Sequence, residues 1–521
     1  MTPTPQPLRI DRLHLTDFGA GSCPRHRRAK PASAVKRKDK IENPLLLGEV
    51  RDGIERRFCH GEDEASLRRR LADGKLTEPE CEQVVSAVGR FAPLPDGMEM
   101  DDRPLVFQHE TPGSRHIREI VPWGLTIFGD DRRLARLVLL RNSEQSMPLD
   151  DSRIAAAAKC AAAGKPAHKP SQGDWYTASY RVESSSTVVT RVEIVEYLLD
   201  SGDSRTRFEG TAAEALDYYK RVGRPAGVRA MDSTAARPGY DCDHCALAST
   251  CDTLPSVPGL LGVEAPGTPR ATWSATNGRN HHQCPRKDHL QRQKVSGAAP
   301  SDRERVGRAV DAALNLRHRE GKPCNTMELP STVGEWQALG DVRTPEEASA
   351  AAGMLAWHTA MSCPFIEQDT AESQPQASVI AFDPTANVIV RAMPDLLYTD
   401  DGGLVWRETK TTSRLSRCGV DPLQSWWKIQ VATAVLLLGS GAAGASPPFR
   451  YELELLTEDG GDVLPIDATD PAEIERARAV VATVVRPWRD DPRDHSTRPG
   501  DHCRFCDFRE RCEDAVGGED A

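Results

Sequence analysis

Eight of the fourteen cysteines recur at one fixed distance along the chain, and this repeat constrains the fold more than any other feature. They form two triplets of spacing C-x2-C-x5-C, each preceded far upstream by a single Cys-Pro pair. All positions shift by one offset, because 284 − 23, 503 − 242, 506 − 245 and 512 − 251 each equal 261. Four matches at one offset indicate a tandem duplication. The sets are Cys23, Cys242, Cys245 and Cys251 in the first copy and Cys284, Cys503, Cys506 and Cys512 in the second.

A Pro- and Gly-rich run without clear periodicity, residues 254–270, separates the two copies and is predicted to be a linker. The copies are then domains over residues 1–253 and 271–521, which is a common domain size. In each domain the distant Cys-Pro is expected to join its triplet. This arrangement would tie the two ends of the domain together.

Cysteine content and the first residues together predict a cytoplasmic protein. The segment MTPTPQPLRI lacks the apolar core of a signal peptide, and no stretch approaches the roughly 20 apolar residues that cross a bilayer. In a reducing compartment, clustered cysteines are expected to bind metal rather than to pair. Four thiolates suit a zinc ion or a [4Fe–4S] cluster, and the spacing leaves both open. The cysteines outside the repeat are expected to be ordinary buried or surface thiols: Cys59, Cys81, Cys160, Cys324, Cys363 and Cys418.

The formal net charge of −10 argues against a chain that binds polyanions over its whole surface. Contact with nucleic acid would need a local basic patch, and one run of this kind, CPRHRRAKPASAVKRKDK, begins at Cys23. It either forms a solvated surface or follows phosphates without regard to base sequence. The residues predicted to bind DNA in the second case are Arg25, Arg27, Arg28 and Lys30.

A β-hairpin is predicted in the second copy. Two runs rich in β-forming residues, Val388–Tyr398 and Leu404–Thr411, flank the turn signal Asp-Asp-Gly-Gly. If Asp401-Gly402 is a two-residue turn, Asp400 faces Gly403 across the hairpin.

The same register brings two carboxylates and a lysine together. Asp395 faces Glu408, because 395 + 408 equals 400 + 403. Opposed side chains share one face of a sheet, and Lys410, two residues after Glu408, points the same way. Opposed carboxylates repel each other unless a cation lies between them, so the pattern favours a divalent metal ion held by oxygen ligands. A solvated surface hairpin is the alternative.

Pro394-Asp395 followed by Glu408-Thr409-Lys410 resembles the motif of the PD-(D/E)xK nucleases. The second copy resembles the RecB-like exonucleases of that superfamily, over most of residues 268–515. In these enzymes, which include the AddAB-type and CRISPR-associated RecB-like exonucleases, a [4Fe–4S] cluster clasps the nuclease core with one cysteine before it and three after it. The resemblance implies an α/β fold of two tandem restriction-endonuclease-like domains. Each would have a mixed central sheet flanked by helices and a C-terminal cysteine cluster.

The resemblance also implies a site and its chemistry. Asp395, Glu408 and the backbone carbonyl of Thr409 would hold one or two Mg²⁺ or Mn²⁺ ions for hydrolysis of a phosphodiester. Lys410 would orient the attacking water or stabilise the transition state. Gln430, on the predicted helix DPLQSWWKIQVATAVLLLG, would orient the substrate or the lysine. Each four-cysteine set would hold a [4Fe–4S] cluster, with zinc as the alternative.

Two positions depart from the family pattern. A histidine usually stands four residues after a glycine ahead of the core, and here Asp311 follows Gly307 at that spacing. An aspartate can also ligate a hard cation, so Asp311 is a candidate metal ligand. The family's Gln-x-x-x-Tyr helix has Ala434 in place of the tyrosine.

The first copy is predicted to have lost these residues. Matching Leu137-Val138 to Leu404-Val405 places Arg141 where Glu408 stands and Ser143 where Lys410 stands. An arginine repels a metal ion, so the first copy is interpreted as an inactive nuclease-like domain kept for binding DNA or a partner.

The resulting hypothesis is a metal-dependent DNA exonuclease or single-strand-directed nuclease in repair, recombination or defence. The expected partner is DNA, either single-stranded or at its ends, and no association with a membrane is expected. The sequence has no Gly-x-x-x-x-Gly-Lys-Ser/Thr loop, so unwinding would need a separate helicase or ATPase subunit. The alternatives are a catalytically weak iron–sulfur DNA-binding or scaffold subunit of a larger complex, and a redox sensor built on the clusters.

Overall fold

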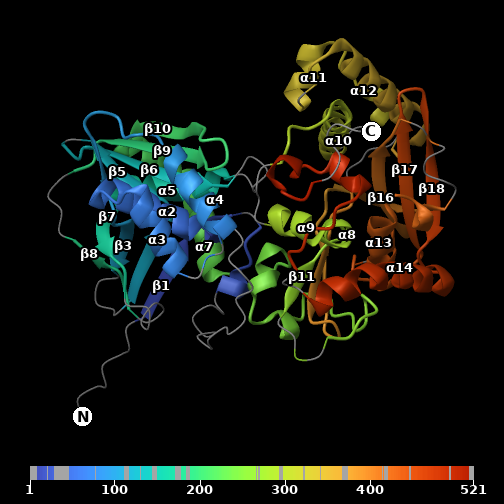
Figure 1. Ribbon diagram of the computed structural model, residues 1–521, viewed down its shortest axis with the longest axis horizontal. Helices are drawn as coiled ribbons and strands as arrows, with labels where there is room; N and C mark the ends of the chain where they lie inside the picture. Colours follow the sequence, from blue (N-terminus) through green and yellow to red (C-terminus); the bar gives the residue numbers. More distant parts are fainter. Residues whose placement is uncertain are drawn as a thin grey trace. The chain divides into compact units, whose positions relative to one another are not determined.

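The computed structural model divides into two compact units, Met1–Leu247 with Gln291–Ser296 and Ala248–Leu290 with Gly297–Ala521. Figure 1 colours the chain from blue at the N-terminus to red at the C-terminus. The structure describes residues 9–19, 21–27, 46–74, 76, 78–110, 116–129, 131–142, 149–170, 178–183, 188–265, 267, 270–292, 297–320, 323–340, 342–365, 373–413, 415, 421–444, 447–491 and 494–515.

The first unit combines helices with two five-stranded sheets. Its main sheet has the order β2 (Met98–Asp101), β5 (Leu125–Gly129), β6 (Leu134–Arg141), β9 (Arg191–Leu198) and β10 (Ser204–Thr211). The other sheet has the order β1 (Arg9–His14), β4 (His116–Val121), β3 (Leu105–Glu110), β7 (Lys165–His168) and β8 (Arg181–Val182). The helices are η1 (Leu15–Phe18), α2 (Leu47–His60), α3 (Glu64–Asp73), α4 (Glu78–Arg90), α5 (Asp151–Ala163), α6 (Ala212–Tyr218), η3 (Tyr219–Gly223), α7 (Arg224–Asp232) and η4 (Tyr240–His244).

The second unit has a five-stranded and a three-stranded sheet. The main sheet has the order β12 (Gln374–Pro375), β15 (Leu396–Asp400), β16 (Gly403–Thr411), β17 (Phe449–Thr457) and β18 (Gly460–Asp467). The smaller sheet has the order β11 (Ala271–Trp273), β14 (Val388–Ala392) and β13 (Val379–Asp383). The helices are η5 (Ala248–Thr250), α8 (Ala275–Gln283), α9 (Pro285–Arg292), α10 (Asp302–Glu320), η6 (Cys324–Thr326), α11 (Val333–Leu339), α12 (Pro345–Trp357), η7 (His358–Ser362), η9 (Pro422–Gln424), α13 (Lys428–Gly439), α14 (Pro471–Asp490), η10 (Asp501–Phe505) and η11 (Arg509–Arg511).

The two main sheets share one pattern of strand directions. In the first unit β5 is antiparallel to β2 and β6, β6 is parallel to β9, and β9 is antiparallel to β10. In the second unit β15 is antiparallel to β12 and β16, β16 is parallel to β17, and β17 is antiparallel to β18. The central strand of each main sheet therefore has one antiparallel and one parallel neighbour.

The core of the second unit lies between its main sheet and α13, which packs against α14 in the same layer (Figure 1). The sequence VATAVLLLG makes α13 apolar around its whole circumference, as expected for a helix covered on all sides. Trp406 of β16 and Tyr451 of β17 are fully buried against this helix layer. The helix predicted to carry Gln430 is present as α13, but it begins only at Lys428, and residues 422–424 form η9. Asp311 lies on α10.

The predicted hairpin register is confirmed, and one predicted strand is corrected. Asp400 pairs with Gly403 and Leu396 with Arg407, so the register continues to Asp395 and Glu408 as expected. Asp401 and Gly402 both have positive φ angles, as a type I′ turn requires. The run Val388–Tyr398, expected to be one strand, is instead split between β14 and β15 of two different sheets. Pro394 stands at the break, where it has no N–H to donate to a ladder.

In the segment predicted to be a linker, the described residues 254–265 pack into the second unit. Leu260, Leu261 and Val263 belong to its hydrophobic core. The fully buried carboxylate of Asp383 holds this segment, because it accepts hydrogen bonds from the backbone N–H groups of Gly259 at 3.0 Å and Leu261 at 2.9 Å. Proline and glycine shape the turns of this segment without making it a spacer.

Within the described part of the chain, none of the helices has the length and apolar character needed to cross a membrane.

We expect Asp383→Ala to destabilise the second unit by about 3 kcal/mol. The carboxylate also accepts hydrogen bonds from the N–H groups of Thr385 and Ala386, and its loss would leave buried donors without an acceptor. Urea unfolding followed by tryptophan fluorescence measures the change, since seven of the nine tryptophans lie in residues 273–488.

The matched control is Asp459→Ala, which removes the same group from the exposed turn between β17 and β18. Equal unfolding midpoints for the two variants would contradict the anchoring role of Asp383.

Candidate active site

The β15–β16 hairpin brings Asp395, Glu408 and Lys410 together. Asp395 directly precedes β15, while Glu408 and Lys410 stand two residues apart on β16 and share one face of the sheet. The Lys410 ammonium donates hydrogen bonds to Glu408 Oε2 at 2.9 Å and to Asp395 Oδ2 at 3.3 Å. Two carboxylates thus converge on one lysine, as the sequence predicts.

Neighbouring groups fix the orientation of both carboxylates. The backbone N–H of Thr409 donates to Asp395 Oδ2 at 2.8 Å. The indole N–H of Trp406 donates to Glu408 Oε1 at 3.1 Å, and the Gln430 side-chain amide donates to Glu408 Oε2 at 2.6 Å. Gln430 reaches this point from the first turn of α13, so the structure brings this predicted residue into the site as well.

Burial dominates the electrostatics of the site. Glu408 is only 1% exposed, and this desolvation raises its pKa to about 7, although the positive charge of Lys410 acts in the opposite direction. Burial alone would lower the pKa of Lys410, but the charges of Glu408 and Asp395 outweigh burial and hold this pKa above its ordinary value. Lys410 therefore stays protonated at neutral pH, while Glu408 is poised between its two states.

Asp311 adds a third carboxylate from α10. Its side chain is exposed at the surface and accepts a hydrogen bond from the Asn315 amide at 2.9 Å. Partial desolvation, followed by the negative charge of Asp395, raises the pKa of Asp311 to about 6. A Cβ on Gly307 would lie 2.8 Å from Thr411 Oγ1, so the absence of a side chain there lets α10 approach the end of β16.

The donors of this site are of the type that binds a hard divalent cation. The carboxylates of Asp311, Asp395 and Glu408 carry more negative charge than Lys410 alone balances. Oxygen donors of this kind are the ligands that Mg²⁺ and Mn²⁺ prefer.

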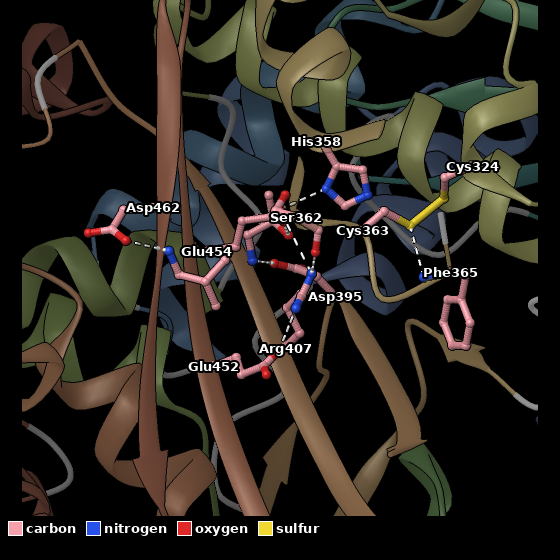
Figure 2. A network of polar contacts seen from close by, with 12 residues as sticks. Cys324, His358, Ser362, Cys363, Phe365, Asp395, Arg407, Glu452, Glu454 and Asp462 are labelled. Atoms are coloured by element: carbon pink, nitrogen blue, oxygen red, sulfur yellow. Dashed lines mark hydrogen bonds and ion pairs between the residues drawn. A yellow bond between two sulfur atoms is a disulfide. The ribbon is translucent and has the colours of Figure 1, made fainter. Parts of the chain in front are cut away.

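A second polar network lies on the opposite face of β16 (Figure 2). Glu454 of β17 accepts hydrogen bonds from Thr409 Oγ1 at 2.7 Å and from the Ser362 hydroxyl, and its Oε1 lies 2.8 Å from His358 Nδ1. Burial alone would raise the pKa of Glu454, but His358, Arg407 and Ser362 outweigh burial and hold it well below the usual range. The prediction from sequence missed this network, although the charged residues within the buried strand YELELL were a visible signal.

The second cysteine set lies where the two ends of the unit meet. Cys284 directly follows α8, and the Arg286 N–H donates to the Ser496 carbonyl at 3.1 Å, close to the triplet in sequence. Burial raises the pKa of the Cys506 thiol, and the charge of Cys284 contributes to the same shift. Cys503, the first cysteine of the chain's second triplet, is buried, and Cys512 is partly exposed.

Three cysteines of the first set are held close together. Cys23 Sγ accepts a hydrogen bond from the Arg237 N–H at 3.3 Å, and Cys242 Sγ accepts one from the Gly239 N–H at 3.4 Å. Burial raises the pKa of Cys242 to about 11, with further contributions from Cys245 and Cys23.

Cys251, the fourth predicted ligand of the first set, lies within the range of the second compact unit. None of the eight cysteines in the two sets forms a disulfide.

The main sheet of the first unit carries an ion pair at the predicted lost site. Arg141 ends β6 and pairs with Glu196 of β9, which also pairs with Arg207 at 3.0 Å. Ala155 of α5, which the alignment of the two copies matches to Gln430, is fully buried. Ser143 lies outside the described residues.

Only part of the predicted basic patch is described. Arg25 and Arg27 are half-buried, and Arg27 donates a hydrogen bond to the Ala230 carbonyl at 3.3 Å. Arg28 and Lys30 lie outside the described residues.

Two cysteines expected to be ordinary thiols behave differently. Cys324 and Cys363 form a disulfide, although they are separated by 39 positions in the sequence. Cys59, Cys81 and Cys160 are free thiols, as predicted. Cys418 lies outside the described residues.

Comparison with known proteins finds one family model that matches part of this chain. Residues 272–513 match the family model of the PD-(D/E)XK nuclease superfamily. No curated protein matches the sequence. A solved structure titled "Crystal structure of SSO0001" is 11% identical, over 48% of this chain and 90% of that chain, with a TM-score of 0.23, and similarity at this level carries no argument. The matched segment contains Asp311, the whole β15–β16 site and Gln430. Residues 272–513 therefore carry a PD-(D/E)XK nuclease superfamily domain.

Proposed function

We propose that this chain is a metal-dependent deoxyribonuclease whose active site is the Asp395–Glu408–Lys410 cluster. One observation carries the proposal: in a segment that matches a nuclease superfamily, two carboxylates and a lysine converge on one face of a hairpin. Convergence of these groups is the arrangement that metal-assisted phosphodiester hydrolysis needs.

Asp311, Asp395, Glu408 and the Thr409 carbonyl are the proposed ligands of Mg²⁺ or Mn²⁺. When bound, the ion would lower the pKa of a water molecule and balance negative charge on the phosphate. The hydrogen bond from the Thr409 N–H keeps the Asp395 carboxylate in place for this role. Glu408 is constrained at both oxygens by Trp406 and Gln430.

Lys410 is proposed to act on the reacting phosphate. Its raised pKa keeps the ammonium charged at the pH of the cell. A cation held within 3.3 Å of both carboxylates is well placed to orient the attacking water or to stabilise charge in the transition state. Gln430 would act through Glu408 as a positioning residue.

The first unit is proposed to be an inactive copy that arose by tandem duplication. The constant offset of 261 residues and the shared strand directions of the main sheets support this inference. The cysteine triplets also begin alike, since the Cys242 N–H donates to the Gly239 carbonyl and the Cys503 N–H to the Gly500 carbonyl. The ion pair between Arg141 and Glu196 accords with the loss of a metal site in this copy, which is proposed to bind DNA or a partner instead.

The two cysteine sets are proposed to hold [4Fe–4S] clusters, one for each copy, with zinc as the alternative. The contact between Arg286 and Ser496 supports a clasp that joins the start of the second unit to its end. The resemblance to RecB-like exonucleases extends the proposal to DNA ends or single strands as substrate. Duplex unwinding would come from a separate helicase subunit in repair, recombination or defence.

We expect Asp395→Asn to reduce cleavage of labelled single- and double-stranded DNA by at least about 100-fold, because the amide cannot supply the charge that holds the cation. The control is Asp401→Asn, the same change in the turn at the other end of the hairpin, where asparagine tolerates a positive φ angle. Undiminished cleavage by the Asp395 variant, with Mg²⁺ or Mn²⁺, would place the active site elsewhere.

The Mg²⁺ requirement should depend on pH through Glu408. Because the pKa of this carboxyl is about 7, most molecules carry a proton there at pH 6, and a cation must displace it. The Mg²⁺ concentration for half-maximal cleavage should therefore rise about tenfold from pH 8 to pH 6. A constant requirement over this range would mean that Glu408 is not a metal ligand.

Iron and sulfide analysis tests the cysteine sets. The wild-type chain should contain about eight iron atoms, and Cys503→Ser about four, since one of two clusters loses a ligand. Cys59→Ser, which changes a thiol outside both sets, should keep the wild-type content. Zinc without sulfide would replace the iron–sulfur assignment by the zinc alternative.

A further inference from the structure

A buried group of two histidines and two cysteines lies apart from the active site and from both repeated cysteine sets. His318 stands near the end of α10, Cys324 begins η6, His358 begins η7 and Cys363 directly follows η7. All four side chains are buried, and one ligand atom from each lies within 4.8 Å of the others. Among the described residues, a group of this kind is found at this one place.

The distances from His318 to the two sulfurs match those between ligands of a single tetrahedral ion. His318 Nε2 lies 3.7 Å from Cys324 Sγ and 3.8 Å from Cys363 Sγ. In a tetrahedral zinc site, bonds of about 2.3 Å to sulfur and 2.1 Å to nitrogen place these atoms about 3.6 Å apart. His318 is therefore already at ligand distance from both sulfurs.

His358 supplies an independent indication of a ligand. Its Nδ1 lies 2.8 Å from Glu454 Oε1, while its Nε2 is buried without a hydrogen-bond partner. With the proton on Nδ1, donated to the carboxylate, the lone pair of Nε2 is available. A carboxylate that orients a histidine in this way is a usual feature behind metal ligands, and a bound ion would satisfy the buried nitrogen.

We propose that His318, Cys324, His358 and Cys363 bind one Zn²⁺ ion when the two cysteines are reduced. Two thiolates and two imidazoles form a closed tetrahedral set with no position for a water molecule, so the ion would be structural. It would fasten the end of α10 to η6 and η7, two short helices joined in this structure by the Cys324–Cys363 disulfide (Figure 2).

The disulfide and the zinc site are alternative states of one pair of cysteines. A dithiol reductant breaks the Cys324–Cys363 bond by two successive exchanges, after which the reductant carries the disulfide and each cysteine carries a proton. Zn²⁺ then replaces these two protons, which pass to the solvent, and the ion itself is neither oxidised nor reduced.

The zinc site would adjoin the Glu454 network, on the face of β16 opposite to the proposed active site. Glu454 connects the two, because its Oε1 faces His358 and its Oε2 accepts a hydrogen bond from Thr409 Oγ1. Thr409 in turn donates its backbone N–H to Asp395. The inference itself does not depend on nuclease activity, since metal content can be measured on any preparation of the chain.

The test is zinc analysis of the full chain, purified with a dithiol reductant and incubated with zinc before desalting. Cys324→Ser/Cys363→Ser should contain one zinc equivalent less than the wild-type chain. The matched control Cys59→Ser/Cys81→Ser, which removes two thiols outside every cysteine group, should keep the wild-type content. The difference is decisive even if zinc occupies other cysteines, and equal contents in both double variants would overturn the proposal.

Measurements on the wild-type chain cover the case in which the variant does not fold. Less than one zinc per reduced chain would overturn the proposal. If the reduced chain binds one or more zinc ions, the zinc X-ray absorption spectrum should show histidine nitrogen at about 2.1 Å and sulfur at about 2.3 Å from the ion. A shell of sulfur alone would assign the metal to the repeated cysteine sets and reject this site.

Discussion

The two-residue turn at Asp401–Gly402 sets the register on which the rest of the candidate active site depends. Because side chains alternate along a strand, a slip of one residue would turn Glu408 and Lys410 to the opposite face of β16. The positive φ angles of the turn and the pairing of Asp400 with Gly403 exclude such a slip. A local backbone conformation at one end of the hairpin thus determines which charges meet at the other end.

Strand β16 carries two charged networks, one on each of its faces. Glu408 and Lys410 lie towards α13 with Gln430, whereas Arg407 lies on the opposite face with Glu452. A buried charge is tolerated where an opposite charge and hydrogen bonds balance it, and each of these groups has such partners. The candidate active site has an excess of carboxylates over cations, which is the property that suits it to a metal ion.

Local patterns in the sequence predicted which charged side chains of the hairpin meet, and tertiary contacts account for the differences elsewhere. The meeting of Asp395 with Glu408 follows from turn chemistry and the two-residue period of a strand, so it could be derived from about fifteen residues. The Cys324–Cys363 contact could not, because it depends on how η6 and η7 pack. The prolines and glycines of residues 254–270 predicted a linker. The buried side chains of Leu260 and Leu261 instead join this part of the chain to the core. The break at Pro394 reflects a missing backbone donor that β-propensity alone does not register.

Gly307 lets helix α10 lie close to the end of strand β16. The gap between α10 and β16 is as narrow as it is because this residue has no side chain, and Asp311 lies one helical turn further on. An added Cβ at Gly307 would meet the Thr411 hydroxyl, so a larger residue requires either that this hydroxyl rotates away or that α10 moves from β16, which would widen the space between Asp311 and the hairpin carboxylates. If α10 moves, the size of the ion that the proposed site accepts would change through a residue that is not itself a proposed ligand.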